Sequence, residues 1–262
     1  MVCQSAENAV FFVMASVYQK KNCAALTFAL VVFGLMIACL TVPWYFWSST
    51  FTQKASNVVS GTGVTTTATV ILNSTTIMYD LIGTRTGSQL SGSVATVQSY
   101  TNLQSNTNPS IFSTFKLSQA FVLIALILSF ALAVVLAVFL LDPIRNKAIF
   151  TLGMTLTRAI LLVVCLLLIA SATISFLGFL GVSAAFKRDQ SSCNEGPCRA
   201  FAGAVTSQFD DGAVTSVTSW GPQAGWYIAL AATPITLLIT FLVAINRFPL
   251  PIDSEASSGE AL

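Results

Sequence analysis

Histidine is absent from this chain, and charged residues make up only 8% of its 262 residues. Soluble domains carry about 25% charged residues, so most of the outer surface of this protein must face lipid. The absence of histidine removes the commonest general base and metal ligand, and a net charge of +2 supplies no basic surface for nucleic acid. We therefore expect an integral membrane protein that is not an enzyme, with no catalytic residue, metal site, cofactor or nucleic-acid partner.

Apolar residues make up 55% of the chain and gather in four long runs. A helix of about 20 apolar residues crosses the hydrocarbon core of a bilayer, which is about 30 Å thick. The longest run, 148–186, contains one charged residue, Arg158, and as a single helix it would be roughly 58 Å long. Such a helix crosses the bilayer and still projects from one face. We predict membrane spans at 23–42, 117–141, 155–183 and 226–245.

Shorter or more polar segments flank and separate these spans. The first, 1–22, has an apolar patch that ends at Lys20 and Lys21 and is too short to span, which indicates an interfacial helix. Its Cys3 is either a free thiol or a palmitoylated one. The remaining segments are a large loop, 43–116, a turn with the start of the next helix, 142–154, a second loop, 184–225, and a tail, 246–262.

Both large loops contain segments typical of strands. In the first loop, 64–72, 75–82 and 93–100 are rich in β-branched residues and alternate in part. In the second, 204–209 and 213–219 flank an Asp-Asp-Gly turn typical of a hairpin. An isolated hairpin is marginally stable in water, so we predict one extracellular β-sheet built from both loops. Its unpaired edges would provide assembly contacts through Val64, Thr66, Ala68, Val70, Val205, Ser207, Val214 and Ser216.

Two motifs in the loops indicate passage through the secretory pathway. Asn73 begins the chain's single N-glycosylation sequon, Asn-Ser-Thr, between two predicted strands. Cys193 and Cys198 flank a Gly-Pro turn, and outside the cell that spacing predicts a local disulfide. Zinc would need two more ligands, and the chain has no histidine to supply them.

Small residues recur along two predicted spans at helical spacing. Rows of small residues let a neighbouring helix approach closely, which is the usual way that helices pack in lipid. The rows favour packing within the chain, and dimerisation through the same surface is the alternative. The residues are Ala125, Ser129, Ala133 and Ala137 in one span and Ser171, Ser175 and Gly178 in another.

Aromatic residues cluster where the first span ends and the last begins. Rings with a polar edge favour the level of the lipid headgroups, so Trp44, Trp47, Trp226 and Tyr227 are predicted interface anchors. An aromatic box for a ligand is the alternative for the first pair.

The positive-inside rule gives a weak orientation, because six lysines and arginines lie on each predicted side. The rule weights short loops, which favours cytoplasmic termini, and the sequon and paired cysteines agree with this. We expect the plasma membrane, with an endosomal or vacuolar membrane as the alternative.

The layout of four spans, a long strand-bearing first loop, a tight turn and a shorter second loop resembles the claudin-type tetraspan superfamily. That group includes claudins, peripheral myelin proteins, glutamate-receptor auxiliary subunits and fungal eisosome proteins. The residues that carry the resemblance are Trp44 and Trp47 after the first span and Gly-Pro-Gln-Ala-Gly-Trp-Tyr at 221–227. The first loop differs from that of claudins, because it contains no cysteine. The resemblance implies a four-helix bundle with an extracellular sheet and roles in adhesion, membrane organisation or channel accessory work.

The spans are chemically inert, whereas the loops are long and rich in strand-forming residues. We therefore expect a non-enzymatic membrane protein that scaffolds the membrane or mediates adhesion by forming homo-oligomers or arrays through its loops. The alternative is an oligomeric pore subunit or an auxiliary subunit of another channel or transporter.

Overall fold

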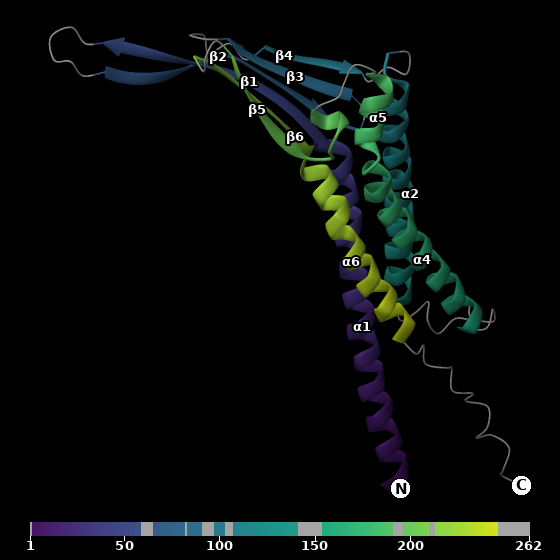
Figure 1. The fold of residues 1–262 in the computed structure, drawn as a ribbon. Coiled ribbons are helices and arrows are strands. Elements are labelled where there is room, and N and C mark those ends of the chain that lie inside the picture. The colour runs from purple at the N-terminus through teal and green to yellow at the C-terminus, as the bar shows by residue number, and fades with distance from the viewer. Residues whose placement is uncertain are drawn as a thin grey trace, which may run out of the picture. The chain divides into compact units, whose positions relative to one another are not determined.

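The computed structural model describes residues 2–58, 65–81, 83–90, 97–102, 107–140, 154–190, 196–209 and 213–245. Its helices are α1 (Val2–Thr41), α2 (Pro109–Leu140), α4 (Met154–Phe179), α5 (Val182–Asp189), the short 3₁₀ helix η2 (Gly196–Cys198) and α6 (Ala224–Ile245). Its strands are β1 (Tyr45–Val58), β2 (Thr65–Tyr79), β3 (Gly83–Leu90), β4 (Val97–Asn102), β5 (Gly203–Phe209) and β6 (Val214–Pro222) (Figure 1).

Among the described residues, four helices are long and apolar enough to cross a membrane. The candidate spans are Lys20–Thr41, Pro109–Val138, Ala159–Phe179 and Ala224–Ile245. The chain is therefore a multi-pass membrane protein whose environment is a lipid bilayer, as the composition predicts. Pro234 lies inside α6 without ending it.

Two helices differ from the sequence-based expectation. The first helix is continuous from Val2 through the first span, so Lys20 and Lys21 do not end a separate interfacial helix. The single helix predicted for the run 148–186 ends earlier than expected at its C-terminal end. α4 stops at Phe179, and α5 begins at Val182 after a turn. At that turn the Leu180 N–H donates to the Leu177 carbonyl (3.0 Å) and the Gly181 N–H donates to the Gly178 carbonyl (3.3 Å). Such i to i+3 bonds tighten the final turn and end the helix.

The chain forms two compact units. One contains residues 1–34, 124–170 and 232–262, and the other contains residues 35–123 and 171–231. In the first unit the Phe33 and Phe130 rings lie 5.5 Å apart. Ala125, Ser129 and Ala133 are buried there, whereas nearby Ile127 is 66% exposed. The row of small side chains therefore faces protein, and the large apolar side chain faces outward, where lipid would lie.

The second unit contains a six-stranded antiparallel sheet in the order β4-β3-β2-β1-β6-β5. Strands from both loops join in it, as predicted, because β1 of the first loop pairs directly with β6 of the second. Two predicted strands, 64–72 and 75–82, are in fact one strand, β2. The Asn-Ser-Thr sequon lies inside that strand because pairing with β1 and β3 keeps its backbone extended.

An aromatic core joins the sheet to the helix ends within the second unit. Tyr45, Phe115, Phe179 and Phe186 are each at most 1% exposed. Phe179 packs edge-to-face on Phe115 at 4.9 Å between centroids and on Tyr45 at 6.1 Å. Aromatic pairs in this geometry contribute about 0.5–1.5 kcal/mol each beyond their burial. The core therefore fixes the sheet on the helix ends of its own unit.

Trp44 is part of this core, so its predicted role as a membrane-interface anchor is wrong. Its side chain is completely buried, and its indole N–H donates to the Cys39 carbonyl (2.7 Å). Its backbone N–H donates to the Tyr79 carbonyl, and its carbonyl accepts from Gln223. A fully buried ring cannot reach lipid headgroups. Trp44 instead ties the end of α1 to β2 and to the start of α6.

Candidate functional site

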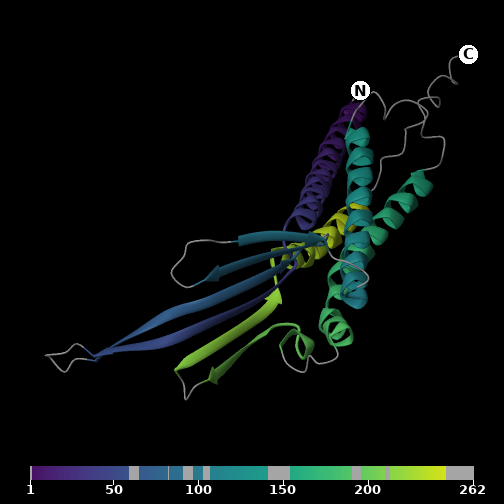
Figure 2. The ribbon, with the colours of Figure 1, turned by 90° about the horizontal axis from the view of Figure 1, so that it is seen from above.

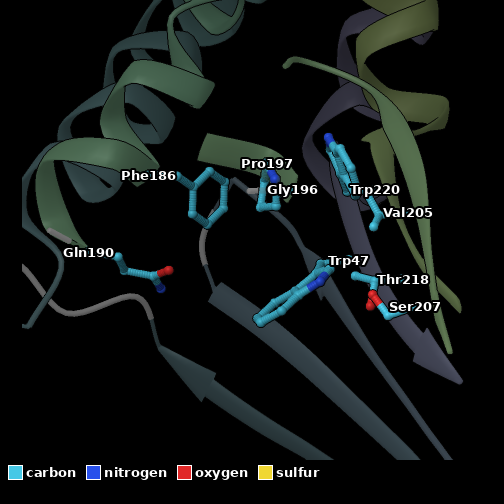
Figure 3. A pocket seen from close by; sticks show the side chains of 9 residues that line it. All are labelled: Trp47, Phe186, Gln190, Gly196, Pro197, Val205, Ser207, Thr218 and Trp220. Carbon is cyan, nitrogen blue, oxygen red and sulfur yellow. The ribbon is translucent and has the colours of Figure 1, made fainter. Parts of the chain in front are cut away.

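One face of the sheet carries a cavity of about 210 Å³ between the strands and the α5–η2 segment (Figure 3). Trp47 pairs with Trp220, and side chains two residues apart on a strand share a face. The cavity therefore collects alternate residues from three neighbouring strands and closes them with two short helical elements. The lining residues are Trp47, Phe186, Gln190, Gly196, Pro197, Val205, Ser207, Thr218 and Trp220.

The Trp220 wall of the cavity is held rigidly. The indole N–H of Trp220 donates to the Ala200 carbonyl (2.9 Å), and the side chain is only 5% exposed. Gly203 lies so close beneath the ring that an added Cβ would be 2.8 Å from Trp220 Cζ2. Gly196 has φ +67°, a backbone conformation that favours glycine, and faces the same ring. This wall is therefore formed before anything binds.

The opposite wall is formed by Phe186, which is 1% exposed. Its ring packs on Tyr79 at 5.6 Å and on Tyr45 at 5.8 Å between centroids. Gln190 follows at the C-terminal cap of α5 and is exposed at the cavity. Phe186 is fixed by the core, whereas Gln190 remains free to meet a ligand.

Trp47 differs from the other three tryptophans in its hydrogen bonding. The indole N–H groups of Trp44, Trp220 and Trp226 each donate to a backbone carbonyl. The Trp47 Nε1 atom is shielded from solvent and has no hydrogen-bond partner in the described part of the chain. A buried polar group without a partner costs about 1–3 kcal/mol, so folding alone does not explain this ring.

A second hollow lies on the other side of Trp47. It has a volume of about 270 Å³ and is lined by Trp47, Ser49, Thr75 and Ile77. Trp47 pairs with Ile77 and Ser49 with Thr75, so these residues share a face of the sheet with the first cavity. The half-buried indole of Trp47 therefore stands between two depressions on one face.

In the part of the chain that the structure describes, the lining of the cavity is uncharged. None of its nine lining residues is charged. The nearest carboxylate on the α5 segment, Asp189, is engaged elsewhere, because its two oxygens accept from the backbone N–H groups of Ser110 (3.0 Å) and Ile111 (2.8 Å). That contact caps the first turn of α2, and the negative carboxylate is stabilised by the positive end of the helix dipole. In the described residues no group of three potential metal-binding side chains comes together.

The phenols behind the cavity are protonated at neutral pH. Burial raises the pKa of Tyr79 to about 12. Burial, with a smaller contribution from Tyr79, raises the pKa of Tyr45 even further. The Tyr45 hydroxyl donates to the Phe201 carbonyl (3.0 Å), so it acts as a structural donor. The chemistry available at this site is binding by stacking and neutral hydrogen bonds.

Within the described residues, the β1–β2 hairpin has open edges on both sides. The two strands pair along their whole length, but β6 reaches along β1 only to Gln53. On the other side, β3 reaches along β2 only to Asn73. Beyond these residues the hairpin continues as a two-stranded ribbon, which we call the arm (residues 54–58 and 65–72). Figure 1 and Figure 2 show the arm extending past the neighbouring strands.

The structure separates the predicted assembly residues. Val70 lies in the arm, as do Thr66 and Ala68, and Val64 lies outside the described residues. Val205 and Ser207 lie on β5, which is an edge strand. The prediction is wrong for Val214 and Ser216, because β6 pairs with β1 on one side and β5 on the other. A strand that is paired on both sides has no free backbone groups to offer.

The remaining predicted residues have varied surroundings. Ser171, Ser175 and Gly178 lie along α4, where both serines are buried and a Cβ on Gly178 would be 3.4 Å from Leu117. Ala137 is half-buried. Tyr227 is 54% exposed and remains a candidate interface anchor, whereas Trp226 donates to the Phe176 carbonyl.

Two modification sites stay predictions. Asn73 is half-buried in β2 at a β-bulge, where the pairing shifts between Phe51–Asn73 and Thr52–Ile71. Cys198 is buried and is not one of the free cysteines Cys23, Cys39 and Cys165 of the described part. Its predicted partner, Cys193, lies outside the described residues.

The cavity itself could not be recognised in the sequence. Its residues come from β1, β5, β6, α5 and η2, which are far apart along the chain. The one available signal was the second tryptophan after the first span, for which an aromatic ligand box is the alternative interpretation.

Comparison with protein-family models and with curated protein sequences finds no match for this chain.

Proposed function

We propose that this protein organises or joins membranes by assembling with further copies of itself through the open edges of its sheet. The arm is the observation that carries the proposal. Two-stranded ribbons are at best marginally stable in water, and their outward N–H and C=O groups remain available for pairing. A strand from a second copy would complete the arm by adding to one of these edges.

The composition of the arm supports pairing. Natural sheets protect open edges with charges, prolines or bulges that turn the edge away. Lys54 is the sole charged residue in β1 and β2, and neither strand contains proline. The arm part of β2 is instead rich in threonine, valine and isoleucine, which favour extended backbone.

The opposite edge of the sheet offers a second surface. β5 carries no charged residue and is exposed along most of its length, with Val205 37% and Phe209 52% exposed. An arm on one copy and an edge strand on another are different surfaces. Contacts between different surfaces are heterologous, and they continue from copy to copy as rings or open arrays.

The orientation belongs to the same proposal. We place both termini in the cytoplasm and the sheet outside the cell, at the plasma membrane. The support is the charge of the short connections, the Asn73 sequon, the Cys193–Cys198 spacing and the resemblance in layout to claudin-type tetraspan proteins.

Trimming the arm tests the proposal without removing a central strand. Residues 54–69 are replaced by Asn-Gly, which connects Gln53 to its pairing partner Val70 through a tight hairpin turn. All the pairing of β1 with β6 and of β2 with β3 is kept. The size of particles in mild detergent is measured by light scattering and electron microscopy, and a tail deletion of similar length is the control.

We expect oligomers or arrays from the wild type and the tail deletion, and single particles from the trimmed protein. A monomeric wild type, or a trimmed protein that assembles normally, would reject assembly through the arm. Closed rings with a water-filled centre would favour the alternative function of an oligomeric pore.

A further inference from the structure

We propose that the cavity between the sheet and the α5–η2 segment binds one neutral sugar ring, the terminal unit of an uncharged glycan. The inference is independent of assembly through the arm. It rests on three features of the cavity: its aromatic walls, its neutral polar groups and the lack of charge among its described lining residues.

The walls suit a ring with an apolar face. Trp47, Trp220 and Phe186 bring three aromatic rings to one small space, as Figure 3 shows. Trp220 and Phe186 are buried and held in place, whereas the half-buried Trp47 presents its indole between two hollows. The C–H groups on one face of a pyranose pack against such an indole by dispersion and by attraction to its negative face.

The polar groups suit hydroxyls. Gln190 supplies an amide with donors and an acceptor, and Ser207 and Thr218 supply hydroxyls that both donate and accept. The Thr218 hydroxyl already forms a hydrogen bond with the Ser49 hydroxyl (3.3 Å). A purely apolar ligand would offer no partner to the Gln190 amide or the Ser207 hydroxyl and is disfavoured for that reason.

The absence of charge selects against ionic ligands. Burial of a carboxylate or an ammonium group without an opposite charge is strongly unfavourable, and none of the described lining residues supplies one. A sialic acid, a uronic acid or an amino sugar in its charged form would therefore bind poorly. Hexoses such as glucose, galactose and mannose meet the requirement.

The size of the cavity indicates a single ring. Pockets for drug-sized ligands occupy roughly 300–1,000 Å³, and this cavity is smaller, at about 210 Å³. The rest of a glycan would leave through the open side of the cavity. The sugar can belong to a glycolipid headgroup or to a soluble or protein-linked glycan, because the recognised chemistry is the same.

Fluorine NMR on the whole chain tests the proposal. The protein is labelled with 5-fluorotryptophan, reconstituted into phosphatidylcholine nanodiscs and titrated with the methyl glycosides of glucose, galactose and mannose. The Trp47→Phe variant assigns the Trp47 resonance. We expect at least one neutral glycoside to shift that resonance saturably, while the resonance of the buried Trp44 stays unchanged. Methyl glucuronide, which has the glucoside ring with a carboxylate, should bind at least tenfold more weakly.

Three variants decide whether binding occurs in the cavity. Val205→Phe fills it from the exposed edge strand and should weaken binding at least tenfold. Gln190→Ala removes one exposed amide and should weaken it by about threefold to tenfold, as expected for one hydrogen bond. Val217→Ser is the control, because Val217 is exposed on the opposite face of β6. This variant should bind the glycoside as tightly as the wild type.

The outcomes are distinguishable. A shift of Trp47 with free glycosides supports the site for soluble glycans, and a shift only in nanodiscs that contain glucosylceramide assigns the sugar to a lipid headgroup. The proposal is overturned if the Trp47 resonance shifts neither with free glycosides nor with glucosylceramide. Equal binding of the glucuronide, or unchanged binding in Val205→Phe, would also overturn it. Failure of this test leaves assembly through the arm untouched, because the arm residues do not line the cavity. Val205 also lies on the β5 edge, so the particle size of Val205→Phe is measured to separate an effect on assembly from one on binding.

Discussion

Substitution of Gly225 by alanine should destabilise the protein strongly. A Cβ at this position would be 2.5 Å from Trp44 Nε1 and 3.0 Å from Trp44 Cγ, and it would also meet Trp44 Cδ1. Trp44 cannot easily move away, because it is completely buried and packs on Phe179 at 5.3 Å. The backbone is also constrained, since the Gly225 N–H donates to the Pro43 carbonyl (2.9 Å).

The size of the effect follows from two terms. Overpacking of a well-packed core costs about 1–3 kcal/mol. Displacing the indole also endangers its hydrogen bond to Cys39, and a buried group without a partner costs about 1–3 kcal/mol. Together they give a loss of about 2–6 kcal/mol in the free energy of unfolding, which corresponds to a fall in Tm of roughly 5–25 °C for a chain of this size.

Thermal unfolding in detergent, followed by tryptophan fluorescence and circular dichroism, measures the effect. Gly34→Ala is the matched control, because a Cβ on Gly34 meets nothing within 4 Å and alanine favours helix. Its Tm should be unchanged or slightly higher. In a double-mutant cycle, Trp44→Phe should reduce the cost of Gly225→Ala, because the smaller ring leaves space. A Tm for Gly225→Ala equal to that of the control would refute the tight contact, and additive costs would refute its assignment to Trp44.

Three further predictions concern the second unit. Asp189→Ala should lower the free energy of unfolding by about 1–2 kcal/mol, because two backbone N–H groups at the start of α2 lose their acceptor. Amide hydrogen exchange should become faster in that turn, and unchanged exchange there would contradict the prediction. The unfolded-state pKa of Tyr79 is about 10 and the folded-state pKa about 12, so its contribution to stability should be complete below pH 10 and lost as the pH rises to about 12. Urea unfolding across that range should show a smaller loss in Tyr79→Phe, and an equal loss would contradict the assignment. Gly203→Ala should destabilise the sheet through its contact with Trp220, whereas the same change at Gly87, where a Cβ meets nothing within 4 Å, should not.

The membrane class and the helix count were readable from the sequence because they depend on local composition. Runs of about 20 apolar residues cannot remain in water, and each such run encodes its own helix. The participation of both loops in one sheet was also predictable, since an isolated hairpin could not bury enough surface. The edge strands of the sheet were not predictable. The side of β6 that is covered depends on β1, which directly follows the first span and shows little alternation of polar and apolar residues.

The sequence by itself therefore determined that this chain is a multi-pass membrane protein, with four candidate spans in its described part, and that both large loops carry strands. Only the tertiary structure decided that Trp44 is core and Trp47 is exposed to a cavity, although the two lie three residues apart. The physical reason is that burial and strand pairing are set by partners distant in the chain. Phe179 and Gly225 enclose Trp44, whereas Trp220 and Phe186 stand across a cavity from Trp47.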